Sequence, residues 1–548
     1  MNKTLVAVSV GAALAGGAWA DGNHPGQFKF KPDTLVLGRS VYVGTPSLLV
    51  PGVTLLPPGC VAGTVDVPLI AGGTTPVAVT CSTPIADGTF PGVFNNAAAD
   101  GHFGITSPIF LDNLTTDGHL LDTLTIPTDR IVTSFSSKSE LAVNRSVDGK
   151  SITFMGYHGG PGFPTAVNIF DVSNANTPGV VDPTNAAVGQ YYRSVAEVDS
   201  RGHLEITEGN AYSGDNGRGA IKGNGLYYTV GNDNSGNLSK KQVTSTIIGE
   251  ELVHSTGAEL LVPGQTPPLP PNIAKIGDFE INQVIEPSTG LPYALDKAGK
   301  DDNFRGITIF NNTLYVTKGS GGNGINTVYQ VGNTGVLPAG DTATLAALPI
   351  TILPGFPHTL ASGVSSTGAA TPVAFPFGIW FANEKTLYVC DEGDGTLVSP
   401  AVNGNVADAA TLATAGVQKW TLANGMWQMD YVLQNGLNIG VPYAVANYPA
   451  ALYPATDGCR NLTGHVGEDG IATIYAVTST VSTSGDQGAD PNLLVKVTDR
   501  LDAVTPPRGD ASTHQGSFGQ FVTIRRAVAG EVFRGVAFAP EADAGGDE

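Results

Sequence analysis

One unit recurs along this chain and limits its possible folds more than any other feature. The clearest copy runs from Arg305 to Val331, with two apolar runs joined by Asn311-Asn312, then a Gly-rich loop and a third run. Asparagines tolerate the positive φ of a tight hairpin turn, and the flanking runs are rich in β-branched and aromatic residues. Each copy therefore predicts antiparallel strands joined alternately by a short turn and a long loop.

The same order of runs returns elsewhere in the chain. The further copies cover 139–162 with 168–172, 218–236 with 257–262, 377–395 with 416–422, and 460–488 with 492–497. A fourth apolar run follows most copies, at His203–Ile206, Pro349–Leu353, Trp427–Leu433 and Phe521–Ile524. A repeat of four strands predicts the blades of a β-propeller.

A sixth first strand, Arg534–Phe538, comes just before the chain ends. Near the other end, Thr34–Val43, Ile109–Leu111 and Leu120–Ile126 read as strands that lack a first member. Joining the two ends completes a blade and removes open sheet edges. We therefore predict an all-β fold, a single six-bladed propeller closed by its terminal strands. The alternative, two packed sandwiches, does not explain the split copy.

The start of the chain predicts export. Met1–Ala20 carries one lysine, an apolar run and a small-x-small ending, which is typical of a secretory signal peptide, so the mature chain begins near Asp21. No later run is long enough for a spanning helix. We expect the propeller over 21–540, with a Gly/Pro-rich insertion at 44–100 and an acidic flexible tail at 541–548.

The net charge and the cysteines limit the possible binding partners and the cellular compartment. A formal net charge of −20 argues against nucleic acid and anionic membranes, and we expect a monomer. Four cysteines fit two disulfides of an oxidising compartment, Cys60–Cys81 and then Cys390–Cys459. The chain has no c-type haem motif and no nucleotide phosphate loop, which excludes those two cofactor signatures.

Loop chemistry points to one face. In a four-strand meander the second-to-third-strand loops lie on the same side as the links into the next blade, and here those loops are long and polar. Among them, Asp391, Glu392 and Asp394 alternate with glycine, which suits a divalent cation, Ca²⁺ above all. The other interpretation is a solvated acidic turn.

Arginines begin the first strand of four copies: Arg218, Arg305, Arg460 and Arg534. The innermost strands line the propeller axis, so these side chains would crowd positive charge at its mouth. They would bind a carboxylate or phosphate, or form structural pairs with the nearby carboxylates Asp215, Asp301 and Asp302.

A third group supplies proton chemistry. Tyr157 and His158 lie on one long loop and Lys318 on the equivalent loop of another blade, where they would act as a general base and an electrophilic cation. An incidental surface histidine is the competing interpretation.

One copy carries a family resemblance. Pro376-Phe377-Gly378-Ile379 with Thr386–Asp391 resembles the blade motif of gluconolactonases, NHL-repeat proteins and phytase-like propellers. In the gluconolactonases an Asn before the first-strand Gly and an Asp after the second strand serve metal-dependent lactone hydrolysis. This chain keeps Asp391 at the second place and has Phe377 at the first.

These observations give two functional hypotheses. The first is a periplasmic or extracellular metal-assisted hydrolase or lyase, acting on a small anionic substrate at the channel mouth. The alternative is a non-catalytic propeller that binds a ligand or takes part in surface assembly, because the fold alone does not fix the function.

Overall fold

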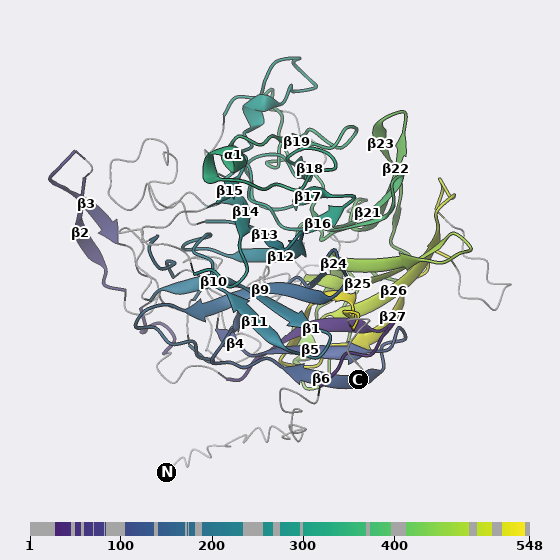
Figure 1. The fold of residues 1–548 in the computed structure, drawn as a ribbon, viewed down its shortest axis with the longest axis horizontal. Helices are drawn as coiled ribbons and strands as arrows, with labels where there is room; N and C mark the ends of the chain where they lie inside the picture. Colours follow the sequence, from purple (N-terminus) through teal and green to yellow (C-terminus); the bar gives the residue numbers. More distant parts are fainter. Residues whose placement is uncertain are drawn as a thin grey trace, which may run out of the picture.

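The sheets of this protein are arranged around an axis as a closed six-bladed β-propeller (Figure 1). The computed structural model describes residues 28–44, 50–55, 60–69, 71–79, 81, 83, 105–135, 141–169, 172–173, 175–180, 189–233, 256–266, 274–295, 300–368, 373–395, 413–481, 490–506 and 518–542. The predicted signal peptide and most of the tail lie outside these residues. Within them, no helix is long and apolar enough to cross a membrane.

Each blade is an antiparallel sheet of four strands, numbered here from the inside outward. Blade 1 is β28 (Glu531–Phe538), β1 (Leu35–Val41), β5 (Ile109–Leu114) and β6 (Leu120–Thr125). Blade 2 is β8 (Asn144–Arg145), β9 (Ser151–Gly159), β10 (Tyr191–Asp199) and β11 (Leu204–Thr207), and blade 3 is β12 (Gly217–Gly223), β13 (Leu226–Gly231), β14 (Gly257–Leu261) and β15 (Lys275–Ile276). Blade 4 is β16 (Ile307–Phe310), β17 (Thr313–Lys318), β18 (Thr327–Val331) and β19 (Ile350–Ile352). Blade 5 is β20 (Pro376–Asn383), β21 (Thr386–Asp391), β22 (Gly416–Ala423) and β23 (Met426–Leu433), and blade 6 is β24 (Ala455–Val466), β25 (Ile471–Val481), β26 (Leu493–Arg500) and β27 (Val522–Arg526).

The chain ends close the ring, as the sequence predicted. β1 pairs antiparallel with β28, with Leu37 opposite Val536. Polar contacts reinforce this blade and tie it to blade 6, because the fully buried Asp112 binds Arg39 Nε at 2.9 Å and Arg525 Nη2 at 3.2 Å. A buried carboxylate held by two guanidiniums links the first and last blades.

The innermost strands of adjacent blades approach so closely that several positions admit only glycine. A Cβ on Gly306 would lie 1.7 Å from Phe377 O, and one on Gly378 would lie 2.6 Å from Arg460 O. On Gly535 it would lie 2.3 Å from Val143 N. The glycine that follows a first-strand arginine is therefore a packing requirement of the narrow axis.

The turn chemistry read from the sequence is confirmed in blade 4. Asn311 and Asn312 connect β16 to β17 with φ of 47° and 54°. The third strand of blade 2 was predicted wrongly at 168–172, and it is β10 instead. The longer run of β10 pairs with β9 along all of that strand. Asn168 and Ile169 hydrogen-bond instead to Thr106 of the short ribbon β4 (Thr106–Ser107) and β7 (Thr133–Ser134).

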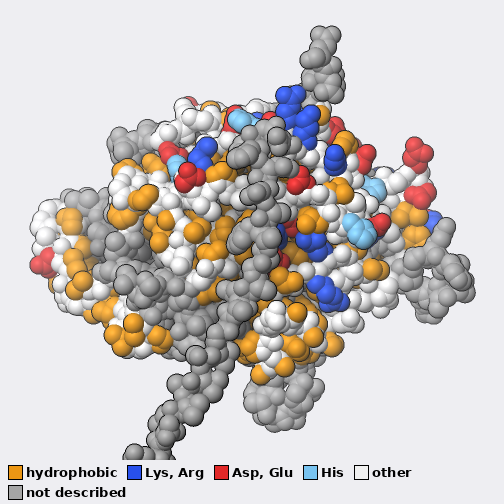
Figure 2. Space-filling view, turned by 90° about the horizontal axis from the view of Figure 1, so that it is seen from below, with side chains coloured by type: hydrophobic (Ala, Val, Ile, Leu, Met, Phe, Trp, Pro, Cys, Tyr) orange, Lys and Arg blue, Asp and Glu red, His pale blue; other side chains and the backbone are white. Residues whose placement is uncertain are grey.

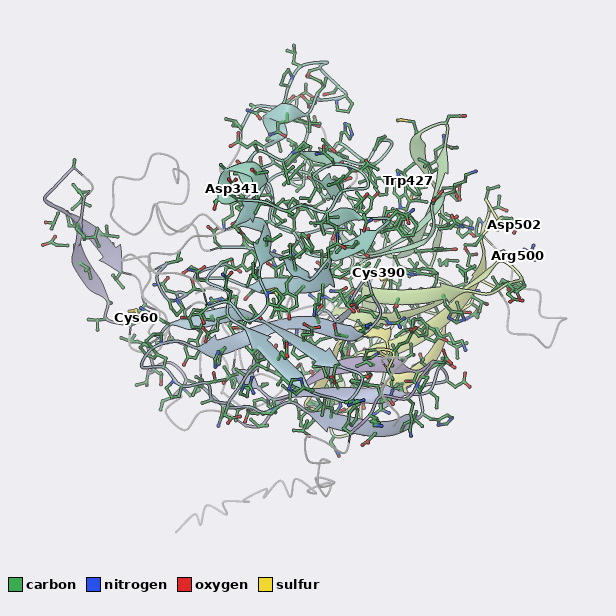
Figure 3. All side chains as sticks on the ribbon, viewed as in Figure 1. Cys60, Asp341, Cys390, Trp427, Arg500 and Asp502 are labelled. Atoms are coloured by element: carbon green, nitrogen blue, oxygen red, sulfur yellow. A yellow bond between two sulfur atoms is a disulfide. The ribbon has the colours of Figure 1, made fainter. Side chains whose placement is uncertain are left out.

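Apolar side chains fill the spaces between the sheets (Figure 3). Between blades 4 and 5, Phe310 stacks on Phe381 with ring centroids 4.8 Å apart. On the molecular face seen in Figure 2, exposed apolar side chains are interspersed with acidic and basic ones.

Small elements lie outside the blades: the helix α1 (Thr342–Ala346), the 3-10 turns η3 (Ile281–Gln283) and η4 (Ala450–Leu452), and the ribbon β2 (Gly63–Pro68) with β3 (Thr74–Val79). This ribbon projects from the body (Figure 1), and Cys60–Cys81 joins the two segments that flank it. The Cys390–Cys459 disulfide links β21 of blade 5 to β24 of blade 6. Both predicted disulfides are present.

Candidate functional site

The long second-to-third-strand loops meet the segments that lead into the next first strands. Glu392 N donates to Phe375 O at 2.9 Å, while Phe375 N donates to the Asp391 carboxylate at 2.9 Å. In blade 3, Lys300 donates to Asn232 Oδ1 at 3.0 Å. These contacts show that each of these loops lies on the same side of the propeller as the segment that leads into the next blade.

Each first-strand arginine occupies an irregular position of its strand. The β-ladder registers skip Arg218, Arg460 and Arg534, each of which is an extra residue against the neighbouring strand. In blade 4, Arg305 N donates to Thr317 O while Thr317 N donates to Gly306 O, so two residues again face one. A β-bulge redirects a side chain that the regular pleat would place elsewhere. The sequence showed the repeated arginine but not the bulge.

The same position carries apolar residues in the other two blades. In blade 5, Phe377 and Gly378 both lie between the paired residues Pro376 and Ile379 of β20. In blade 2, Leu141, with φ of 70°, precedes the residue that bridges to Gly219. Arg460 lies with its guanidinium carbon 5.3 Å from the Phe377 ring centroid, within cation–π range. Four of the six blades thus carry a buried arginine at this position, blade 5 carries Phe377, and Leu141 of blade 2 packs in the apolar core.

All four arginine side chains are buried and have defined partners. Arg218 Nη1 donates to Phe304 O at 2.9 Å and also to Asn303 Oδ1. Arg305 donates to Ser320 Oγ. Arg534 Nε donates to Ser40 Oγ at 3.2 Å, and its Nη2 binds the carbonyls of Ser134 and Phe135.

Arg460 differs from the other three. Its Nε forms an ion pair with Glu392 Oε2 at 3.0 Å, and both side chains are almost fully buried. Its Nη2 atom is also buried, and no hydrogen-bond acceptor reaches it within the described parts of the chain. A buried N–H donor without an acceptor is costly, so this atom marks a place where a further acceptor would bind.

The arginines act on one another electrostatically. Burial and the neighbouring charges of Arg218 and Arg460 together lower the pKa of Arg305 to about 9, against the opposing effects of Glu392 and Asp215. Three guanidiniums therefore lie within electrostatic range. Arg305 remains charged at pH 7, and a bound anion would relieve the repulsion.

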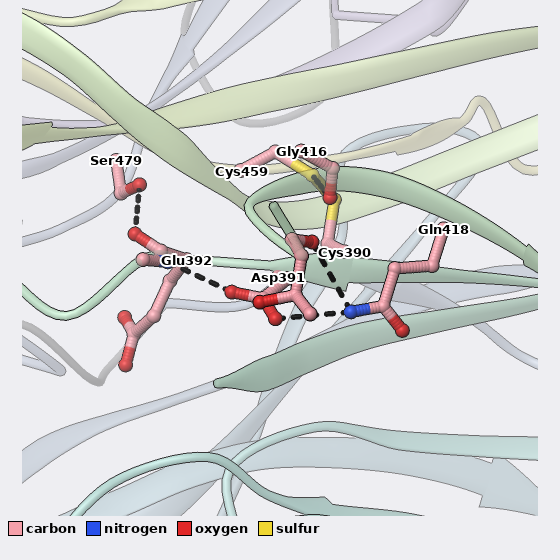
Figure 4. Close-up of a disulfide and its surroundings, with 9 residues drawn as sticks. Cys390, Asp391, Glu392, Gly416, Gln418, Cys459 and Ser479 are labelled. Atoms are coloured by element: carbon pink, nitrogen blue, oxygen red, sulfur yellow. Dashed lines mark hydrogen bonds between the residues drawn. A yellow bond between two sulfur atoms is a disulfide. The ribbon is translucent and has the colours of Figure 1, made fainter. Parts of the chain in front are cut away.

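Hydrogen bonds within the acidic loop and from neighbouring segments hold it in place (Figure 4). The Asp391 carboxylate accepts hydrogen bonds from Phe375 N, Gly393 N and Gln418 Nε2 at 2.9 to 3.0 Å, and Ser479 Oγ donates to Glu392 O at 2.6 Å. Burial raises the pKa of Asp391 to about 6. Asp394 is half-buried in the same loop.

This arrangement does not fit the predicted metal well. Glu392, predicted as a metal ligand, holds Arg460 instead. Within the residues that the structure describes, no three Asp, Glu, His or Cys side chains are arranged to hold a metal ion. We therefore derive no chemical step through a metal, and Ca²⁺ at Asp391, Glu392 and Asp394 stays a prediction.

The predicted proton-transfer residues are separated by the pleat. Tyr157 is fully buried and donates to Asn216 Oδ1 at 2.8 Å, beside the Arg218 bulge. His158, the next residue along β9, points to the opposite face of the sheet. There its Nδ1 lies 3.3 Å from Glu208 Oε1, and about a quarter of the side chain is exposed.

Lys318 lies close to the arginines. Its buried ammonium group donates to Ser320 O at 2.8 Å and to Asn326 Oδ1 at 3.2 Å, and Ser320 also accepts the bond from Arg305. Lys318 is therefore joined to the arginine cluster through Ser320, whereas the contacts described for His158 join it to Glu208 and Tyr192.

Of the carboxylates predicted as arginine partners, Asp215 acts electrostatically on Arg305, whereas Asp301 and Asp302 have other contacts. Asp301 accepts a hydrogen bond from Ile281 N at 2.9 Å, and Asp302 pairs with Lys275 at 3.0 Å. Neither Glu259 nor Lys275, which lie beside Asp302, was predicted as a site residue. Their only signal was a charged residue in each of two outer strands that are otherwise mostly apolar.

The fold defines the class of this protein: a closed six-bladed β-propeller in which four blades carry a buried arginine at or directly before the innermost strand. A scan against protein families matches none of them, and a search of curated proteins finds no similar one. The resemblance to gluconolactonase, NHL-repeat and phytase-like blades therefore depends on the blade motif alone.

Proposed function

We propose that this protein is an exported propeller that binds a small anionic molecule through Arg218, Arg305 and Arg460 at one mouth of its axis. The observation that carries the proposal is the buried Nη2 of Arg460, which has no acceptor in the described structure. Carboxylates and phosphates accept two parallel N–H bonds from a guanidinium, so they satisfy such a donor better than neutral groups do.

The local charge balance supports an anionic ligand. Glu392 pairs with Arg460, and Asp215 acts electrostatically on Arg305. Burial and the mutual repulsion of Arg218, Arg305 and Arg460 still lower the pKa of Arg305, and a bound anion would relieve that repulsion. Phe377, packed against Arg460, adds an apolar wall beside the charged groups. A small carboxylate or phosphate with an apolar part matches this lining.

Export belongs to the same proposal. The N-terminal segment has the composition of a signal peptide, and the two disulfides suit an oxidising compartment. Hydrolase or lyase chemistry at this mouth is the more specific hypothesis, with Lys318 as the nearby cation, whereas His158 lies beside Glu208 on the other face of its sheet. The alternative of surface assembly is favoured by the projecting β2–β3 ribbon, which exposes Val65, and by Val61, which is exposed just before the ribbon.

The anion proposal predicts a defined loss on mutation. Sulfate should raise the melting temperature of the wild-type protein and bind measurably by calorimetry, because it carries two charges and several acceptors. Arg460→Gln should weaken sulfate binding about 10–100-fold, as expected for loss of a charge-assisted hydrogen-bonding group. Arg500→Gln, which removes an exposed arginine paired with Asp502, is the matched control and should bind as the wild type does. Equal sulfate binding by all three proteins would contradict the proposal.

The calcium hypothesis predicts a response to metal removal. If Asp391, Glu392 and Asp394 hold Ca²⁺, dialysis against a chelator should lower the melting temperature, and added Ca²⁺ should restore it. Asp394→Asn should abolish that response. Elemental analysis that finds no stoichiometric metal in protein purified without chelator, together with an unchanged melting temperature, would remove the metal from this site.

A further inference from the structure

A buried acidic side chain in blade 3 has no hydrogen-bond partner. Glu259 lies on β14 with 1% of its surface exposed, and neither of its carboxylate oxygens has a hydrogen-bond donor within the described residues. The strand register places Thr229 of β13 and Lys275 of β15 directly opposite it. An ionised carboxylate in this position would lack the hydrogen bonds that normally make burial tolerable.

The groups around Glu259 do not supply enough positive charge. Lys275 is shared between Asp302 Oδ2 at 3.0 Å and Asp278 Oδ1 at 2.9 Å. Asp233, also buried, lies 3.4 Å from Lys300 and accepts a bond from Thr256. One half-buried ammonium thus serves Glu259, Asp302 and Asp278, with a further carboxylate nearby.

Two buried carboxylates that share one cation do not both ionise easily. Burial raises the pKa of Glu259 well above its usual value, and Asp302 and Asp233 raise it further against Lys275. Burial likewise raises the pKa of Asp302 to about 7. Two carboxylates that repel one another in a buried site titrate as a coupled pair, and the pair retains a proton near neutral pH.

This acid pair adjoins the arginine cluster. Asp302 lies three residues before Arg305, and Arg218 holds the intervening segment by its bonds to Asn303 and Phe304. Tyr212 bonds to Thr229 Oγ1 at 2.9 Å and to Gly257 O at 3.2 Å, and its environment includes Glu259, Arg218 and Asp302 together. A charge placed on the arginines therefore acts on the acid pair.

We infer that Glu259 and Asp302 form a shared proton site that takes up a proton when an anion binds to the arginine cluster, so that ligand affinity falls as pH rises. The inference rests on the proposed anion site. A bound anion repels ionised carboxylates and so favours their protonated form. By reciprocity, ionisation of the carboxylates weakens anion binding by the same factor.

Sulfate is the probe, because it does not titrate between pH 5.5 and 8.5. Calorimetry in two buffers of different ionisation enthalpy measures the protons taken up per sulfate bound. We expect proton uptake near pH 7 and about tenfold weaker sulfate binding at pH 8.5 than at pH 5.5. Glu259→Gln leaves the buried Asp302 beside Lys275, which also pairs with the exposed Asp278, and should remove most of both effects. Glu286→Gln, a carboxylate that is hydrogen-bonded by Ser366, should leave both unchanged.

The outcomes separate the two proposals. Sulfate binding with no proton uptake and no pH dependence overturns the shared proton site and leaves the anion site intact. Absence of sulfate binding at either pH overturns the anion site and the coupling with it.

Unfolding without sulfate tests the acid pair itself. Because both folded pKa values are raised, wild-type stability should fall as pH rises from about 4 through 7, and less so in Glu259→Gln. Parallel pH profiles would show that Glu259 holds no proton.

Discussion

Replacing Gly306 with alanine is expected to destabilise the folded propeller by ~4 kcal/mol or to prevent its folding. The new methyl group would lie 1.7 Å from the carbonyl oxygen of Phe377, a backbone atom of the neighbouring first strand that no rotamer change can move. Blades 4 and 5 would have to separate at the axis. Such a separation would also disturb the blades beyond them, because the ring is closed through β1 and β28.

Gly322→Ala is the matched control for this prediction. It lies in the loop between β17 and β18, and an added Cβ there meets no atom within 4 Å. Urea unfolding followed by tryptophan fluorescence should show Gly306→Ala with a much lower midpoint, while Gly322→Ala stays within about 0.5 kcal/mol of the wild type. Similar midpoints for both variants would mean that the first strands can separate without cost.

The local pattern of the sequence was enough to predict the blades and their closure. Alternating apolar runs, asparagine turns and the incomplete copies at the two ends are short-range signals, and the pairing of β1 with β28 confirms them. The third strand of blade 2 was missed because Asn168–Val172 is the first apolar run after the Gly-rich loop, as in the other copies, whereas Tyr191–Asp199 comes later in the chain. Only the pairing of the whole of β9 with β10 distinguishes them.

The site was harder to predict, for a physical reason. Which partner a buried charge takes depends on contacts between blades, and these are not encoded by spacing along one strand. Glu392 was grouped with Asp391 and Asp394 because they are adjacent in sequence, yet its side chain crosses to Arg460 of blade 6. Glu259 was not predicted as a site residue, because an isolated acidic residue in an outer strand normally faces water.

Removing the disulfide between blades 5 and 6 is expected to have the second large effect. In Cys390→Ala/Cys459→Ala the unfolded chain gains the freedom of a 69-residue loop, which corresponds to ~4 kcal/mol in the chain-entropy description. The other disulfide closes 21 residues, for which the same description gives ~3 kcal/mol. That loop contains the projecting β2–β3 ribbon, so Cys60→Ala/Cys81→Ala should loosen the ribbon without lowering the unfolding midpoint of the blades.

The Cys390–Cys459 disulfide also adjoins the candidate site, so its loss should affect sulfate binding as well as stability. Cys459 directly precedes Arg460, and Cys390 lies two residues before Glu392, its ion-pair partner (Figure 4). Without the covalent link, the positions of these two charges depend on hydrogen bonds alone. Sulfate affinity of the folded Cys390→Ala/Cys459→Ala protein should therefore fall several-fold, while that of Cys60→Ala/Cys81→Ala stays at the wild-type value. A loss of stability with unchanged affinity would show that the ion pair is positioned by the blades themselves, because the disulfide would then contribute only to the entropy of the unfolded chain.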